Sequence, residues 1–256
     1  MVFPVLQDKV TIVTGAAMGM GEATAKLFAQ AGAKVVVADF NEEKGRQVVS
    51  EIEAAGGDAF FVKVDVSSSE AVASMVRETV EHYGRLDAAV NNAALIPDKK
   101  PVAEFDEDYW DRLMSVDLKG VALSMKHEIR QFLAQGSAGS IVNISSVSGF
   151  RPQPDSVAYV AAKHGVVGLT KVAAVDYGAK GIRVNSVAPG AVMTPMLEAA
   201  LERYGQTEEE YAPRMSLLGR VGRPEEIAQA SMWLVSDASS YVTGTTIHVD
   251  AGYTAR

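Results

Sequence analysis

The chain has 256 residues and a mass of 27.2 kDa, and its 48% hydrophobic and 22% charged residues are typical of a globular domain and exclude a disordered chain. The 24 Lys and Arg residues against 32 Asp and Glu residues give a net charge of −8, which argues against a nucleic-acid partner because phosphates attract basic faces. The sequence has no apolar run of the roughly 20 residues that span a bilayer, no signal peptide and no cysteine, so we expect a cytoplasmic protein without disulfides or a membrane partner.

Apolar runs of strand length alternate with amphipathic segments of helix length along the chain. Strands are predicted at residues 9–14, 33–39, 59–66, 86–91, 140–145, 183–188 and 245–250, and their continuous Val, Ile and Ala content suits strands that are covered on both faces. Helices are predicted at residues 21–30, 42–55, 68–83, 108–135, 159–179 and 224–236. The alternation predicts an α/β fold, in which residues 1–256 form a single doubly wound Rossmann domain with a seven-stranded, mostly parallel sheet and helices on both faces.

Two local signals refine this prediction. Ser67 and Glu70 have the spacing of a capping box, which places the start of the third helix beside Ser67. Residues 189–222 form the one irregular stretch, and a loop of this length in a compact domain is often a lid over a substrate. Within this stretch, the acidic run at residues 208–210 indicates the start of a solvated helix.

A glycine-rich turn joins the first strand to the first helix. Gly15, Gly19 and Gly21 allow backbone N–H groups to approach a pyrophosphate at a helix N-terminus. The spacing G-x-x-x-G-x-G differs from the general dinucleotide motif and is also compatible with an ordinary strand-to-helix turn. Asp39 ends the second strand 18 residues beyond Gly21, where a carboxylate can accept hydrogen bonds from both adenosine ribose hydroxyls; the alternative is that Asp39 only caps the next helix.

Two further groups of residues can carry acid–base chemistry. Tyr159 and Lys163 lie four residues apart on a predicted helix and therefore share one face, where the ammonium favours a phenolate that can exchange protons. Ser145 and Ser146 end the fifth strand at the carboxyl edge of the sheet, where a hydroxyl can donate a hydrogen bond to a substrate oxygen. The alternatives are two helix residues without a joint role and two ordinary turn serines.

Together these residues resemble the short-chain dehydrogenase/reductase family over nearly the whole chain. The matching motifs are Thr14-Gly15-x-x-x-Gly19-x-Gly21, Asp65-Val66, Asn91-Asn92-Ala93-Ala94, Ser146, Tyr159-x-x-x-Lys163, Asn185 and Pro189-Gly190 followed by Thr194. Ser146 matches the family's catalytic serine because it lies 13 residues before Tyr159. The resemblance implies that Tyr159 exchanges the proton of the substrate oxygen, that Lys163 assists it and holds the nicotinamide ribose, and that Ser146 positions the oxygen.

The resemblance also implies a nicotinamide cofactor along the carboxyl edge of the sheet. Asp39, and the absence of Lys and Arg between Gly15 and Gly21, favour NAD over NADP. The four histidines have no metal-ligand spacing, so no metal is expected. The residues expected to contact the cofactor are Gly15, Ala17, Met18, Gly19, Met20, Gly21, Asp39, Phe40, Asp65, Val66, Asn92, Ala93, Tyr159, Lys163, Pro189, Gly190, Val192 and Thr194.

The sequence departs from the family pattern at two positions. Ala94 stands where the family has Gly, which is expected to restrict the backbone mildly. Asp117 stands at the family's fourth catalytic position, which is an Asn that helps to hold a relay water. A main-chain role would survive this substitution, whereas a side-chain role would change because a carboxylate only accepts hydrogen bonds. Asn91 and Asn185 are expected to brace the sheet, as such residues do in the family.

The resemblance implies a small-molecule alcohol or ketone substrate and a homotetramer, or else a dimer. The expected substrate contacts are mostly apolar, which suits a bulky cyclic, aryl or steroid-like secondary alcohol: Leu95, Ser148, Gln153, Met193 and Met196. The subunit interface is expected on the helices at residues 108–135 and 159–179, where Val166, Val167, Ala173 and Ala174 are compatible with close packing. Two alternatives remain open, a 3-oxoacyl-[acyl-carrier-protein] reductase and a non-catalytic NAD-binding regulatory protein.

Overall fold

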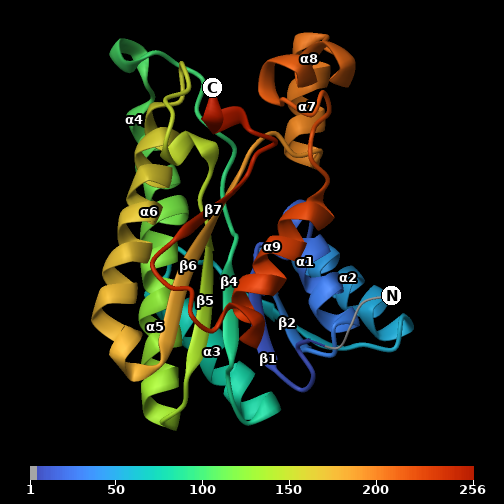
Figure 1. Ribbon diagram of the computed structural model, residues 1–256, viewed down its shortest axis with the longest axis vertical. Coiled ribbons are helices and arrows are strands. Elements are labelled where there is room, and N and C mark those ends of the chain that lie inside the picture. Colours follow the sequence, from blue (N-terminus) through green and yellow to red (C-terminus); the bar gives the residue numbers. More distant parts are fainter. Residues whose placement is uncertain (1–4) are drawn as a thin grey trace.

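The computed structural model describes residues 5–256, and its strands form one seven-stranded sheet (Figure 1). The strand order is β3-β2-β1-β4-β5-β6-β7 and every neighbouring pair is parallel, so the predicted doubly wound Rossmann architecture is confirmed. The strands are β1 (Val10–Thr14), β2 (Lys34–Asp39), β3 (Asp58–Lys63), β4 (Ala88–Asn91), β5 (Gly139–Ile144), β6 (Ile182–Pro189) and β7 (Thr246–Val249).

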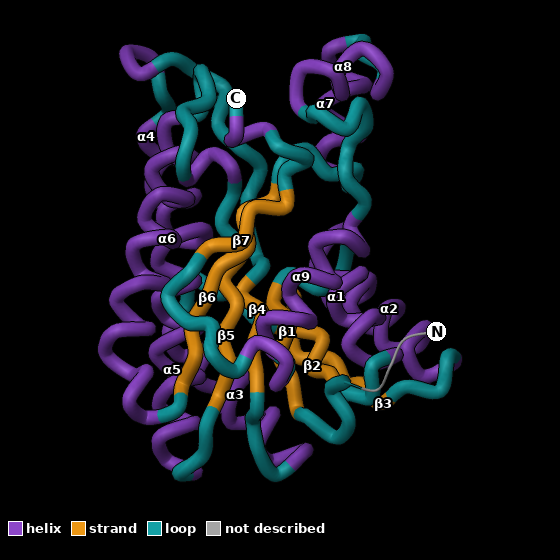
Figure 2. The backbone as a smooth tube through the Cα atoms, in the orientation of Figure 1, coloured by secondary structure: helices purple, strands orange, loops and turns teal. Residues whose placement is uncertain are grey.

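Helices cover both faces of the sheet, and Figure 2 shows the strands enclosed between them. None of the helices within residues 5–256 is both long enough and apolar enough to cross a membrane. The helices are α1 (Gly19–Gln30), α2 (Glu42–Ala54), α3 (Ser69–Tyr83), α4 (Glu107–Leu113), α5 (Val121–Gln135), α6 (Val157–Tyr177), α7 (Pro195–Tyr204), α8 (Glu208–Met215) and α9 (Pro224–Val235).

Each face of the sheet has its own apolar core. Phe28 of α1, Ile52 of α2 and Leu234 of α9 are buried against one face. Met75 of α3 and Phe132 of α5 are buried against the other face, together with residues of α6. Because successive side chains of a strand point to opposite faces, the continuous apolar strands supply both cores.

The residues that the sequence suggested for a subunit interface lie inside the chain instead. Val166, Val167, Ala173 and Ala174 are at most 7% exposed, because α6 turns this face toward its own sheet. Their close packing is therefore confirmed as packing within the chain, and the subunit interface expected on these two helices stays a prediction. The outward face of α6 carries Val172 and Val175, which are 60% and 83% exposed.

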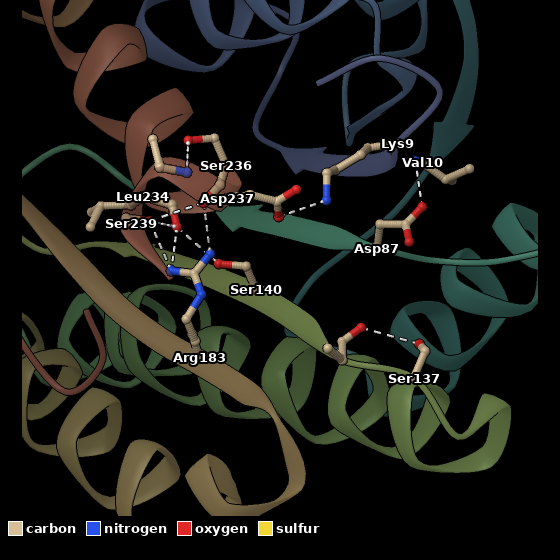
Figure 3. Close-up of polar contacts among 12 residues, drawn as sticks. Lys9, Val10, Asp87, Ser137, Ser140, Arg183, Leu234, Ser236, Asp237 and Ser239 are labelled. Carbon is tan, nitrogen blue, oxygen red and sulfur yellow. Dashed lines mark hydrogen bonds and ion pairs between the residues drawn. The ribbon is translucent and has the colours of Figure 1, made fainter. Parts of the chain in front are cut away.

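Polar side chains at the amino ends of the strands contact the carboxyl end of α9 and the turn after it (Figure 3). Arg183 of β6 donates to the carbonyl oxygens of Leu234 and Ser236 at the end of α9, where a cation is favourable. Ser140 of β5 donates to the same Leu234 carbonyl, and Lys9 pairs with Asp237 at 3.0 Å. Each group has its partners within the chain, so this cluster stabilises the fold.

Two segments differ from their predicted form. Residues 189–222 are not irregular, because they contain the helices α7 and α8. Both helices project away from the sheet (Figure 1). Both helices have side-chain caps, Thr194 for α7 and the capping box of Thr207 and Glu210 for α8. Helix α8 begins at Glu208, so the helix start in the acidic run is confirmed.

The helix predicted at residues 108–135 is interrupted by a π-helical stretch, η2 (Met114–Gly120), between α4 and α5. A π-helix has more residues per turn than an α-helix, but over one short stretch the spacing of apolar residues still looks helical. The hydrophobic periodicity therefore did not reveal the π-helical stretch. The cap of α3 was also assigned to the wrong serine. Ser68 accepts the hydrogen bond from the Ala71 N–H, whereas Ser67 donates to Asp65.

Candidate active site

The strand order reverses between β1 and β4, which opens a crevice at their carboxyl ends. A pocket of about 560 Å³ occupies this crevice and brings together thirteen of the predicted residues. They are Gly15, Met18, Gly19, Met20, Asp39, Phe40, Asp65, Val66, Asn92, Ala93, Leu95, Thr194 and Met196. Sequence reasoning missed Arg112, Ser115 and Val116, which line the pocket from α4 and η2 and belong to no short motif.

Backbone contacts shape the glycine turn at one end of the pocket. A Cβ atom on Gly21 would lie 2.1 Å from the Gly15 carbonyl oxygen, so only glycine fits there. The Asn92 side chain donates to the carbonyl oxygens of Thr14 and Gly15, both at 3.0 Å, and fixes the turn to the end of β4. Thr14, which sequence reasoning gave no site role, accepts the Asn92 and Ala93 N–H groups through Oγ1.

Asp39 at the end of β2 is held in place by two backbone N–H groups. Its Oδ2 accepts from Ala17 at 2.9 Å, and its Oδ1 accepts from Asn41 at 2.8 Å. Asn41, not Asp39, caps α2, so the helix-cap alternative for Asp39 is excluded. The neighbouring residue Phe40 is 70% exposed and also lines this end of the pocket. It offers no positive charge to a phosphate bound beside Asp39.

Several other predicted cofactor residues do not line the pocket. Ala17 acts through its N–H on Asp39, and Val192 is 6% exposed beside its bridge partner Gly222. Gly190 packs on Asp250, where a Cβ atom would lie 2.8 Å from the Asp250 Cα. Pro189 is buried at the end of β6.

The structure separates the roles of the paired serines. The Ser145 hydroxyl is buried and donates to the Val187 carbonyl at 3.0 Å, which is a bond within the sheet. Ser146 begins the short turn η3 (Val147–Gly149), and its Oγ accepts from the Ser148 N–H at 3.1 Å. Its hydroxyl proton is free for another acceptor, so the geometry favours Ser146 as the substrate-facing serine.

Lys163 is the buried cation of the site. Its Nζ lies 5.3 Å from the centre of the Tyr159 ring, 3.3 Å from the Ile144 carbonyl oxygen and 3.3 Å from Asp117 Oδ2. Burial lowers the pKa of Lys163, but the attraction of the Asp117 carboxylate outweighs burial and raises it above its ordinary value. The Asp117 carboxylate thus favours the ammonium form of Lys163 beside the Tyr159 ring.

The two departures from the family pattern have different consequences. Among the described non-glycine residues only Asp8, Asp155 and Ala251 have positive φ, so Ala94 adopts an ordinary conformation without strain. The Asp117 side chain holds the main chain at Leu95, because its Oδ1 accepts the Leu95 N–H at 2.8 Å.

A second buried carboxylate was not predicted. Glu128 of α5 is completely buried and accepts a hydrogen bond from Asn91, which also donates to Asn143. Burial raises the Glu128 pKa to about 8, although the Asn91 bond opposes the shift. Its position on the apolar stripe of Met125 and Phe132 was the available signal.

The polar links confirm that Asn91 and Asn185 brace the sheet: Asn91 joins β4 to β5 and α5, and Asn185 holds the segment before β7. The predicted substrate residues divide into two sets. Leu95 and Met196 line the pocket, whereas Ser148, Gln153 and Met193 do not. Ser148 is completely buried in η3, so its hydroxyl faces the protein interior.

Comparison with known proteins gives a consistent result. The family model described as enoyl-(acyl carrier protein) reductase matches residues 15–254. The short chain dehydrogenase/reductase astE of Aspergillus oryzae is 53% identical over 248 residues, which are 96% of this chain and 95% of that protein. The 2,5-dichloro-2,5-cyclohexadiene-1,4-diol dehydrogenase of Sphingobium indicum is 44% identical over 250 residues, 98% of each chain. Further relatives include a cyclohexanol dehydrogenase from Acinetobacter and a 3-oxoacyl-[acyl-carrier-protein] reductase from Thermotoga maritima, each 41% identical.

Solved structures have the same fold. Levodione reductase superposes with a TM-score of 0.91 at 36% identity, covering 97% of this chain and 98% of that one. A chain from Agrobacterium tumefaciens, solved with bound NADP, superposes with a TM-score of 0.88 at 35% identity and covers 99% of both chains. One similar chain thus binds NADP, so the choice between NAD and NADP in this chain rests on the residues of its own pocket.

Proposed function

The chain belongs to the short-chain dehydrogenase/reductase family of oxidoreductases, and on that premise we propose that it transfers a hydride between NAD and a bulky, apolar, cyclic secondary alcohol or its ketone. The observation that carries the proposal is the buried Lys163 amine beside the Tyr159 ring, in the same chain as the pocket lined by the glycine turn and Asp39.

The residues of the pocket fit a dinucleotide. The glycine turn and the N-terminus of α1 offer N–H groups to a pyrophosphate, and the space left by Gly15 and Gly21 admits no side chain. Asp39 points two held carboxylate oxygens at the end of the pocket where a ribose would lie, and this carboxylate repels a 2′-phosphate. These features support NAD as the cofactor.

A bound NAD supplies the hydride acceptor at its nicotinamide ring. In the direction of alcohol oxidation, Tyr159 as phenolate takes the hydroxyl proton, and the Lys163 ammonium stabilises the negative charge on that phenolate. Ser146 Oγ–H donates to the substrate oxygen and fixes its position. In the reverse direction the phenol returns the proton to the oxygen.

The entrance to the pocket supports a bulky apolar substrate. Leu95 and Met196 line it, and the cyclic diol and cyclohexanol dehydrogenases among the relatives act on ring compounds. Two observations support the carrier-protein alternative: the description of the family model, and the 3-oxoacyl-[acyl-carrier-protein] reductase of Thermotoga maritima, which is 41% identical. Against it, residues 198–214 carry five Glu and two Arg, and this net negative charge repels an acidic carrier protein.

The test is to incubate the protein with NAD and a panel of alcohols, and to follow the absorbance of reduced cofactor. Cyclic and aryl secondary alcohols are expected to turn over with a higher kcat/KM than linear ones. Acetoacetyl-carrier with NADPH is expected to be the poorer pair, and a higher kcat/KM for it than for every alcohol would refute the proposal.

Tyr159→Phe is the control for the mechanism, because it keeps the ring and removes only the acid–base group. We expect at least a hundredfold loss of kcat with nearly unchanged NAD affinity. Turnover within tenfold of the parent would contradict the role of Tyr159.

The homotetramer and the cytoplasmic location remain predictions. The exposed Val172 and Val175 on α6, and a groove of about 650 Å³ lined by Met114, Leu118 and Leu169, support self-association through this face. Light scattering on the purified protein measures the molar mass of the assembly directly. A monomer at micromolar concentration would contradict the predicted homotetramer.

A further inference from the structure

Asp117 lies in the π-helical stretch η2 and is completely buried. Its two carboxylate oxygens have different partners: Oδ1 accepts the Leu95 N–H at 2.8 Å, and Oδ2 lies 3.3 Å from Lys163 Nζ. The first contact needs only an acceptor oxygen, which an asparagine also supplies. The second contact is where a charged carboxylate differs from an amide, since an amide NH₂ group in that place would face the ammonium without attracting it.

The surroundings leave Asp117 and Lys163 as each other's charge partner. From α4, the exposed Arg112 and the Tyr109 phenol face this region, and Tyr109 donates to the Ile96 carbonyl. Asp98, in the segment after β4, accepts the N–H groups of Ala158 and Tyr159 at 3.0 Å each and so is committed to the start of α6.

The other groups around the pair carry no buried charge. Beta-strand β5 offers only the Ile144 carbonyl to Lys163, and Lys119 on the same π-helical stretch is exposed. The side chain of Lys163 is 3% exposed and that of Asp117 is 0% exposed.

A buried pair of this kind affects the neighbouring phenol. A lone ammonium beside Tyr159 would stabilise its phenolate with a full positive charge. A carboxylate at 3.3 Å on the other side of the ammonium cancels much of that field, and burial strengthens the cancellation because water does not screen it. Removal of the carboxylate charge therefore makes the phenolate easier to form while Lys163 remains an ammonium.

We propose that Asp117 is a positioning residue for the acid–base step: as the counter-ion of Lys163 it holds the ammonium in place and sets the pH range in which Tyr159 works. The inference rests on the proposed function for its meaning in catalysis. The ion pair itself is independent of the substrate.

The first test compares pH–rate profiles of alcohol oxidation for the parent and for Asp117→Asn. Oxidation needs the phenolate, so the acid limb of kcat is expected to move down by about one pH unit in the variant. Asp87→Asn is the matched control, because Asp87 also accepts a backbone N–H, from Val10, but lies at the amino end of β4. The control is expected to lose stability and to keep the parent profile, and an Asp117→Asn profile at the parent position would overturn the proposal.

The second test needs neither cofactor nor substrate. The ultraviolet absorbance of tyrosinate is titrated in the parent and in Asp117→Asn, each with and without Tyr159→Phe. Within each pair, subtracting the titration curve of the Tyr159→Phe form leaves the absorbance change of Tyr159 alone. The pH at the midpoint of this change is expected to be lower with Asp117→Asn than with Asp117. Equal midpoints would refute the counter-ion role even if the protein oxidises alcohols. If no alcohol turns over, the proposed function fails, while this titration still tests the ion pair.

Discussion

The two ends of the pocket are built in different ways. The dinucleotide region, defined by Gly15, Gly21, Asp39 and Asn92, is fixed by main-chain contacts and backbone hydrogen bonds. The entrance region, residues 95–101 with α7, presents exposed side chains, such as Ile96 at 54% and Met196 at 38%. Backbone contacts leave no room for added atoms, whereas exposed side chains can change freely. Substitutions are therefore expected to be tolerated better in the entrance region than in the dinucleotide region.

The strongest way to break the dinucleotide region is Gly21→Ala. The new Cβ would meet the Gly15 carbonyl oxygen at 2.1 Å, so we expect a loss of about 3 kcal/mol of unfolding free energy and of NAD binding. Urea denaturation and cofactor titration measure the two losses. Gly178→Ala is the control, since a Cβ there meets nothing within 4 Å and changes stability by at most about 1 kcal/mol. Equal effects of the two substitutions would contradict the close packing.

The cofactor preference tests the carboxylate of the same region. The parent is expected to favour NAD over NADP by about 1.5–3 kcal/mol, roughly 10- to 150-fold, because Asp39 repels the 2′-phosphate. Asp39→Ser with Phe40→Arg is expected to narrow or reverse the ratio of kcat/KM values, since a guanidinium pairs with phosphate. Asp65→Asn, also in the pocket, should affect both cofactors equally. Equal use of NADP by the parent would show that Asp39 does not select the cofactor.

Substitution of Glu128 tests how far its hydrogen bond with Asn91 stabilises β4, whose carboxyl end carries Asn92 of the dinucleotide region. The folded pKa of Glu128, about 8, lies above the ordinary 4.5, so its neutral form favours folding fully below pH 4.5, and this stability is lost as the pH rises to about 8. Glu128→Gln stays neutral, and we expect its gain in unfolding free energy over the parent to grow by about 4 kcal/mol between pH 5 and pH 8.5. Urea denaturation at each pH gives the difference.

The surface variant Glu43→Gln is the control for this series, because Glu43 is exposed at the start of α2. It should show no such trend between the two pH values. A Glu128→Gln gain that is constant over the pH range would show that Glu128 is ionised in the folded chain.

The smallest expected effect lies in the entrance region. Met196→Ala should change the unfolding free energy by less than about 0.5 kcal/mol, because the side chain is 38% exposed, but should raise KM for cyclic alcohols several-fold. Leu201→Ala, at 8% exposed on the same helix, should cost about 2 kcal/mol. Thermal or urea denaturation beside steady-state kinetics separates the two. A large stability loss for Met196→Ala would remove the contrast between the regions.

The sequence alone predicted most of the dinucleotide region because its signals are local. A strand that ends in glycines, a carboxylate at the end of the next strand and a helix with Tyr159 and Lys163 on one face each depend on neighbours in the chain. The choice of Ser146 over Ser145 followed from its spacing to Tyr159, and the structure supports it with the buried Ser145 hydroxyl.

The features that the sequence did not predict depend on contacts between distant segments. The ion-pair partner of Asp117 is Lys163, which lies 46 residues later in the chain on α6. No sequence pattern around residue 117 predicts this contact. The burial of Glu128 depends on the packing of α5 against β4 and β5. Helix α7 and the full extent of α8 were missed for a different reason, since both helices are short and mostly exposed.

The strand order has a consequence for synthesis on the ribosome. Strand β1 lies between β2 and β4, but β2 and β3 leave the ribosome before β4 does. Until β4 arrives, one edge of β1 has no partner, and the glycine turn lacks the Asn92 side chain that later holds it. An unpaired strand edge invites association with other chains. A cofactor cannot protect this intermediate, since the region proposed to bind it is incomplete until β4 is in place.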